Sequence, residues 1–194
     1  NGKSTAGKTT AQVNKMGIAR TFQNIRLFNK MSVLDNVKVG LHSNIETNLF
    51  QSIVHNRQYK VIERETTEKA MDLLQFFNME GLANAPAGSL PYGAQRRLEI
   101  VRALATDPSI ILLDEPSAGM NPSETAELMD NIRKIRDEFH LAVLLIEHDM
   151  SLVMNVCEGL AVLNYGKIIA KGTPSQIQDN PAVIEAYLGR RKDK

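Results

Sequence analysis

The chain has 194 residues, of which 43% are hydrophobic and 23% charged, an ordinary composition for a globular protein with room for one well-buried domain. A formal net charge of +1 excludes a global basic field that would attract nucleic acid or an anionic membrane. One cysteine, Cys157, excludes a disulfide within these residues, and we interpret it as a packing residue. No apolar run approaches the roughly 18–20 residues that span a bilayer.

Near the start, Gly7-Lys8-Thr9-Thr10 has the pattern that ends a phosphate-binding loop, with Gly2 as the first glycine of G-x-x-x-x-G-K-[ST]. In such a loop backbone N–H groups surround the phosphates, the lysine reaches the β- and γ-phosphates, and the next hydroxyl ligates Mg²⁺. Gly2-Lys3-Ser4-Thr5 is a second, overlapping candidate. A flexible segment rich in glycine, lysine and threonine is the plainer interpretation.

The middle of the chain, from Val33 to Asp107, is predicted to be mainly helical. Two apolar faces at helical spacing support this: Ala70, Leu73, Leu74 and Phe77, and then Leu98, Val101 and Leu104 with Ile100. The polar stretch His42–Arg57 has no clear periodicity, and we assign it no structure.

Two short apolar runs, Ile110–Leu113 and Leu141–Ile146, are typical of parallel strands at the centre of a sheet. The segment between them predicts a helix, with Asn121 as its cap, Pro122 in the first position and Glu124 completing a capping box. Its expected buried stripe consists of Leu128, Ile132, Ile135 and Phe139. Strand, helix and strand in this order predict a βαβ unit, and therefore an α/β sheet.

Asp114 and Glu115 directly follow the first of these strands. Ligands bind at the carboxyl ends of strands in open α/β sheets. One acid can hold Mg²⁺, and the next can orient or deprotonate an attacking water. A merely solvated acidic strand end is the alternative. Further on, strands are expected at Leu160–Leu163 and Ile168–Ala170, followed by helices that begin near Thr173 and Asn180 and stop at Gly189.

The segment Leu90–Leu104, with the sequence LPYGAQRRLEIVRAL, resembles the signature segment of the ABC ATPases and the helix behind it. Other segments match that family in its order: Thr21-Phe22-Gln23 resembles the Q-loop, Ser117–Asn121 the D-loop, and Ile146–Asp149 the segment of the switch histidine. The resemblance runs from Gly7 to the end of the chain.

The sequence GIARTFQNIRLF at Gly17–Phe28 is similar to the larger ATPase of branched-chain amino acid importers. The Leu-Pro-Tyr-Gly signature, Asn121-Pro122, Glu147–Met150 and Val183–Gly189 share this similarity. The resemblance implies that the chain powers import of branched-chain amino acids. The identity of the solute rests wholly on the resemblance, because this subunit does not touch the cargo.

The family also implies a fold, cofactors and partners. The fold is a P-loop NTPase (RecA-like) α/β core within one ABC ATPase domain over residues 1–194, with a helical signature subdomain at about residues 33–107. The cofactors are ATP and Mg²⁺. The partners are a second ATPase subunit, two transmembrane permeases and, indirectly, an extracytoplasmic solute-binding protein, with no nucleic acid. The expected location is the cytoplasmic face of the inner membrane.

Residue roles follow from the same resemblance. The phosphates would be held by Gly2, Gly7, Lys8, Thr9 and Thr10. Thr9, Gln23 and Asp114 would order Mg²⁺. Glu115 would be the general base, assisted by Gln23, and His148 would contact the γ-phosphate. Tyr92 and Gly93 would present N–H groups to a nucleotide held by the partner ATPase.

The sequence departs from the family at three positions: Pro91 replaces a serine, Ala94 a glutamine and Asn121 an aspartate. Proline has no N–H, so one hydrogen bond across the dimer is lost, and we expect a heterodimer. The family also places strands before the phosphate loop and between it and the Q-loop. We therefore expect segments to be missing before Asn1 and between about Thr5 and Gln12, which leaves the adenine contact unassigned.

Three alternatives remain open at this point. One is an ABC-type ATPase outside transport, although such proteins carry coiled-coil insertions or a tandem second domain. Another is an importer subunit for a different small solute. A third is a regulatory relative without hydrolysis, against which the presence of Lys8, Asp114, Glu115 and His148 argues.

Overall fold

The computed structural model describes residues 2–43 and 57–188, which form two compact units. The first unit is Asn1–Ile146 and the second is Glu147–Lys194. Most of the unassigned stretch His42–Arg57, and the predicted helix stop at Gly189, lie outside the described residues. Within the described ranges, no helix is long and apolar enough to cross a membrane.

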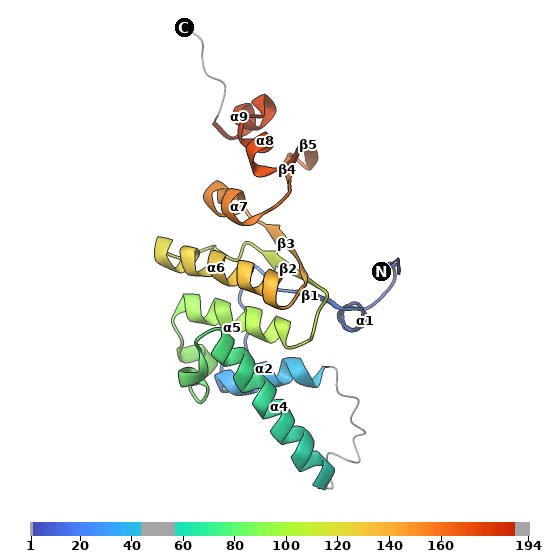
Figure 1. The fold of residues 1–194 in the computed structure, drawn as a ribbon, viewed down its shortest axis with the longest axis vertical. Helices are drawn as coiled ribbons and strands as arrows, with labels where there is room; N and C mark the ends of the chain where they lie inside the picture. The colour runs from blue at the N-terminus through green and yellow to red at the C-terminus, as the bar shows by residue number, and fades with distance from the viewer. Residues whose placement is uncertain (1, 44–56, 189–194) are drawn as a thin grey trace. The chain divides into compact units, whose positions relative to one another are not determined.

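A parallel sheet in the order β1-β2-β3 lies in the first unit (Figure 1). Its strands are β1 Ile18–Arg20, β2 Ile110–Asp114 and β3 Ala142–Ile146. In the register, Ala19 lies beside Ile111 and Leu112 beside Leu144. Helix α6, Pro122–Glu138, connects β2 to β3. The predicted βαβ unit and the α/β class are therefore confirmed.

Strand β3 differs from the prediction of a strand buried on both faces. The side chains of Leu144 and Ile146 are 57% and 54% exposed. Among the described residues β3 is the outer strand of the sheet, and α6 packs against it. Leu144 and Ile146 lie beside Leu112 and Asp114 on one face of the sheet, whereas the buried Ile111 and Leu113 lie beside Val143 and Leu145 on the opposite face.

Helix α6 begins as its sequence predicts. The Asn121 side chain accepts from the N–H groups of Ser123 and Glu124, each at 3.0 Å, and Glu124 completes the capping box. Three of the four predicted stripe residues are buried: Leu128, Ile132 and Ile135. The prediction for Phe139 was wrong, because this residue caps the helix C-terminus and stays 38% exposed.

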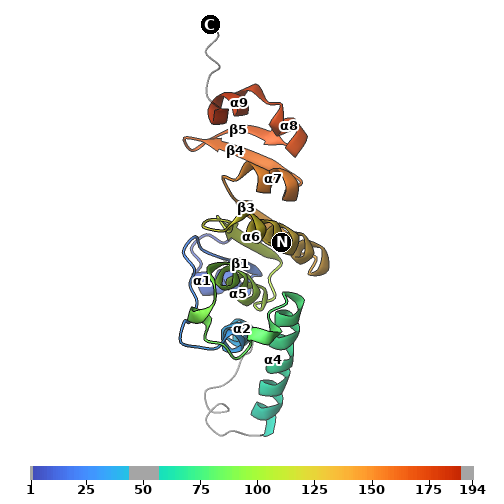
Figure 2. The ribbon, with the colours of Figure 1, turned by 90° about the vertical axis from the view of Figure 1, so that its left-hand side faces the viewer.

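The middle of the chain is helical, as predicted. It contains α2 Val33–His42, α4 Arg57–Phe76, two short 3-10 turns at Glu80–Leu82 and Ala87–Ser89, and α5 Tyr92–Leu104. Helix α2 packs against both α4 and α5 (Figure 2). Gly40 permits the close approach of α2 to α5, because a Cβ there would lie 2.5 Å from the Arg102 carbonyl oxygen. The predicted faces are buried at Ala70, Leu74, Phe77, Leu98 and Val101.

The second unit contains α7 Met150–Val156, the antiparallel pair β4 Leu160–Asn164 and β5 Lys167–Gly172, then α8 Pro174–Gln178 and α9 Pro181–Leu188. Its small core consists of Val162, Ala170, Ile177 and Val183. Thr173 caps α8 through a capping box, as the sequence predicts. Cys157 ends α7 and is partly buried.

Candidate functional site

Two acids stand where the central strand ends. Asp114 is the last residue of β2, and Glu115 follows it with a φ of 45°. Its N–H donates to the carbonyl of Ile146 at the end of β3, at 2.8 Å. A left-handed conformation costs a non-glycine residue about 1–2 kcal/mol, and such residues cluster at functional sites. The chain therefore holds Glu115 at the carboxyl edge of the sheet in a strained conformation.

Gln23 reaches the same edge from the neighbouring strand. Strand β1 ends at Arg20, and the next N–H, that of Thr21, donates to the Leu112 carbonyl on β2 at 2.9 Å. Gln23 Nε2 then donates to Glu115 Oε2 at 2.6 Å. The structure thus brings together three residues that the sequence predicted for catalysis and metal binding: Gln23, Asp114 and Glu115.

Asp114 is paired with Arg20, whose Nη2 lies 2.8 Å from Oδ2. The Arg20 side chain is 52% exposed, and an ion pair at such a position contributes only about 0–1 kcal/mol. A divalent cation could therefore displace the guanidinium at little cost. The Asp114 carboxylate and the amide oxygen of Gln23 are hard oxygen ligands that suit Mg²⁺.

Among the described residues, no group of three or more His, Cys, Asp or Glu side chains could hold a metal ion. Mg²⁺ does not require such a cage, because it usually keeps several waters and is bound through one or two carboxylates and the phosphates of a substrate. The residues at the sheet edge therefore fit Mg²⁺ as a companion of a nucleotide.

Arg96 anchors the backbone beside Gln23, a function that sequence reasoning missed. Its side chain is fully buried and donates to the carbonyl oxygens of Phe22 and Gln23, both at 2.6 Å. The signal in the sequence is Glu99, which stands three residues after Arg96 among apolar neighbours on the same helix. An arginine and a glutamate at this spacing can be buried together as an ion pair.

The signature segment forms the start of α5. Pro91 is the N-cap and makes no side-chain cap hydrogen bond, so the first N–H groups of the helix have no intrahelical partner. Tyr92 is 43% exposed, whereas Gly93 is buried against Glu124, whose Oε1 would lie 2.5 Å from a Cβ at Gly93. The Tyr92 ring lies beside Gly119. The structure therefore packs the signature segment onto the predicted D-loop.

The predicted phosphate loop leads into helix α1. Thr9 caps helix α1, Thr10–Lys15, and its hydroxyl accepts the N–H of Gln12 at 3.3 Å. No strand precedes α1 in residues 2–9, and a Cβ on Gly2 or Gly7 would meet nothing within 4 Å. A helix directly follows Lys8 and Thr9, as it does after a phosphate loop. The roles given to Gly2, Gly7, Lys8, Thr9 and Thr10 stay predictions.

His148 belongs to the second unit. Its side chain is 72% exposed, and its Nδ1 lies 3.9 Å from Oε2 of Glu147. The His148 N–H donates to the same carboxylate at 3.2 Å. Its role at the γ-phosphate stays a prediction.

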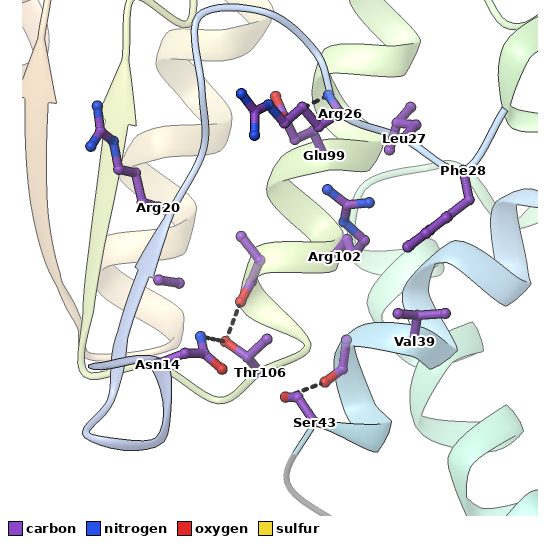
Figure 3. Close-up of a pocket in the computed structure, with 13 residues that line it drawn as sticks. Asn14, Arg20, Arg26, Leu27, Phe28, Val39, Ser43, Glu99, Arg102 and Thr106 are labelled. Carbon is purple, nitrogen blue, oxygen red and sulfur yellow. Dashed lines mark hydrogen bonds between the residues drawn. The ribbon is translucent and has the colours of Figure 1, made fainter. Parts of the chain in front are cut away.

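A cavity of about 680 Å³ lies beside the segment that follows β1 (Figure 3). Its apolar lining includes Leu27, Phe28 and Val39, and the Arg102 guanidinium lies 5.5 Å from the centroid of the Phe28 ring. Burial lowers the pKa of Arg102, and the nearby Glu99 carboxylate opposes this change. The cavity thus combines an apolar wall with charged groups a few residues from Gln23.

An acid pair at the carboxyl end of a parallel strand, a glutamine from the segment after the adjacent strand and a helix N-terminus suited to phosphate are features of nucleotide-hydrolysing α/β proteins. The comparisons with known proteins specify the family. The family model described as ABC transporter matches residues 1–118. The chain belongs to the ABC transporter family and is one of its ATP-binding cassettes. A second model, described as Branched-chain amino acid ATP-binding cassette transporter, matches residues 167–193.

The relatives agree with this assignment. The chain is 45% identical to the high-affinity branched-chain amino acid transport ATP-binding protein BraF of Pseudomonas aeruginosa, over 97% of this chain and 74% of that protein. It is 44% identical to LivG of Escherichia coli, which has the same description, over 92% of this chain and 70% of that protein. A solved ATP-binding cassette of an ABC transporter, in its ADP conformation, has a TM-score of 0.77 and 29% identity, covering 97% of this chain and 74% of that one. The predicted family and fold are confirmed.

Proposed function

We propose that this chain is the subunit that binds and hydrolyses ATP to power import of branched-chain amino acids. The observation that carries the proposal is the hydrogen bond from Gln23 to Glu115, at 2.6 Å, beside Asp114 at the end of β2. The names of BraF and LivG support the solute class.

Each residue at the sheet edge has a distinct role in the proposed reaction. Glu115 accepts the proton of the attacking water, and Gln23 orients this carboxylate and the water by hydrogen bonding. Asp114, released from Arg20, would hold Mg²⁺ together with Gln23. Held by these residues, Mg²⁺ would neutralise charge that develops on the phosphates. His148 is proposed to contact the γ-phosphate in the assembled site.

The first turn of α5 is proposed to complete the site of a second ATPase subunit. Its N–H groups lack intrahelical partners, and a helix N-terminus favours phosphate. Tyr92 and Gly93 would thus bind a nucleotide held by that subunit. Pro91 removes one donor from the contact, so we propose a related but different partner chain.

The remaining partners are two transmembrane permeases, and indirectly a solute-binding protein, with the ATPase at the cytoplasmic face of the membrane. The cavity beside Arg26, Leu27 and Phe28 is the proposed contact with a permease (Figure 3). It has an apolar wall and lies next to the segment that carries Gln23. A permease bound there would sense changes at the hydrolytic site.

The proposal is tested by ATPase activity of the transporter reconstituted in lipid vesicles. Leucine-loaded solute-binding protein should stimulate ATP hydrolysis, because the cargo signal crosses the permeases to the ATPase. A complex that does not hydrolyse ATP would contradict the ATPase assignment. Hydrolysis that leucine, isoleucine and valine all fail to stimulate would refute the solute class and favour an importer for another solute.

A further inference from the structure

A buried ion pair on helix α5 fastens the segment that carries Gln23. The two terminal nitrogens of Arg96 donate to the carbonyls of Phe22 and Gln23, and Nη1 also donates to Glu99 Oε2 at 2.9 Å. Glu99 Oε1 in turn accepts the N–H of Arg26 at 3.1 Å. Two side chains therefore hold the backbone at both ends of the short segment 22–26.

Both members of the pair are removed from water, with 0% and 2% of their side chains exposed. Burial of charges is costly unless they are paired and fully hydrogen-bonded, and apolar residues of similar volume often stabilise a fold as well or better. Stability alone therefore gives no reason for this pair. The planar fork of arginine offers donors at two separate nitrogens, which a lysine ammonium cannot do. Arg96 uses one nitrogen for the Phe22 carbonyl and the other for the Gln23 carbonyl.

The pair also connects two parts of the proposed site. Arg96 lies one turn from Tyr92, and its Nη2 lies 3.3 Å from the Tyr92 hydroxyl. The other end of the connection is the side chain of Gln23, which contacts Glu115. A displacement of the first turn of α5 would therefore move the backbone of Gln23.

We propose that Arg96 and Glu99 are positioning residues for ATP hydrolysis. They clamp segment 22–26 so that Gln23 Nε2 meets the Glu115 carboxylate, and they link this contact to the signature end of α5. The proposal rests on the proposed function of the contact between Gln23 and Glu115. Neither clamp residue touches the nucleotide in this scheme.

The test is the steady-state ATPase activity of the assembled transporter carrying Arg96→Lys. Lysine keeps the charge and loses the fork, so kcat should fall roughly 10- to 100-fold, because a displacement of about 1 Å in a catalytic site can cost about 10² in rate. KM for ATP should stay within about twofold. The matched control is Arg64→Lys, which makes the same change at an exposed i,i+4 pair with Glu68 and should leave kcat unchanged. A wild-type kcat for Arg96→Lys would overturn the proposal.

A double-mutant cycle separates positioning from a general structural role. If Arg96 acts through Gln23, then Arg96→Lys should have no further effect on kcat in a Gln23→Ala background. The same fold-loss in both backgrounds would overturn the proposal. If Arg96→Lys does not fold, Glu99→Gln takes its place, since its amide oxygen can still accept the Arg26 N–H. It should give a smaller loss of kcat that also vanishes with Gln23→Ala.

The cycle also distinguishes this proposal from the proposed function. An inactive wild-type complex would contradict the ATPase assignment itself. An active wild-type complex in which the two substitutions act additively would refute only the positioning role of Arg96 and Glu99.

Discussion

Replacing Glu115 by glutamine should stop ATP hydrolysis while leaving the fold and the binding of ATP intact. The substitution keeps the side-chain volume and removes the negative charge. The hydrogen bond from Gln23, at 2.6 Å, can still form to the new amide oxygen. A neutral hydrogen bond contributes about 1 kcal/mol less than one to a charged group. The strained φ of 45° is unchanged, because glutamine has the same backbone preferences as glutamate.

The effect on the reaction is much larger than this ground-state effect. Loss of a positioned general base lowers the rate by about 10²–10⁴, which corresponds to about 2.7–5.4 kcal/mol in the activation barrier. Binding of ATP depends on contacts with the phosphates and Mg²⁺, in which the Glu115 carboxylate has no part. The account therefore predicts a fall in kcat with little change in affinity or stability.

Three measurements on the transporter carrying Glu115→Gln check this: ATP turnover, retention of bound ATP, and thermal unfolding. The matched control is Glu127→Gln on α6, where the carboxylate pairs with Arg97 away from the sheet edge. This control should hydrolyse ATP at the wild-type rate. Wild-type turnover by the Glu115→Gln variant would refute its assignment as the general base.

Asn121→Ala should destabilise the chain by about 1–2 kcal/mol and lower Tm by a few degrees, because the N–H groups of Ser123 and Glu124 lose their acceptor. Asn121→Asp should keep the wild-type Tm, and an unchanged Tm for Asn121→Ala would contradict the capping role. Lys8→Ala should weaken ATP binding by about 100-fold, the order expected for a lysine that reaches the β- and γ-phosphates; an affinity within about twofold of the wild type would contradict the phosphate-binding role predicted for Lys8. Burial raises the pKa of the Cys157 thiol, so iodoacetamide at pH 8 should label it more slowly than a cysteine peptide. Equal labelling rates for the protein and the peptide would contradict the raised pKa. Because the folded pKa is raised, the contribution of Cys157 to the free energy of unfolding is present below about pH 8.5 and is lost as pH rises.

The features predicted best from sequence depend on neighbours along the chain. The start of α6 at Asn121 follows from hydrogen bonds to residues two and three positions away, which the sequence displays directly. The strand Ile110–Asp114 follows from a short apolar run that ends in acids. The resemblance to the ABC ATPases predicted Gln23 as a site residue. Because β1 lies next to β2, the side chains of Gln23 and Glu115 reach the same edge of the sheet.

Other features depend on contacts that the sequence does not display. The exposure of Leu144 depends on which face of the sheet it occupies, and the continuous apolar run of β3 cannot reveal that. Arg96 donates to carbonyls more than 70 positions away, so its contacts with the segment after β1 cannot be read from the residues around it.

The central claim is that ATP hydrolysis at the edge formed by Gln23, Asp114 and Glu115 drives import of branched-chain amino acids. The most direct measurement is uptake of radiolabelled leucine into vesicles that contain the reconstituted transporter, with the ATPase side supplied with ATP and Mg²⁺. The account predicts uptake that requires ATP and that is lost with Glu115→Gln but retained with Glu127→Gln. Leucine uptake that continues at the wild-type rate with Glu115→Gln, or that proceeds without ATP, would contradict it.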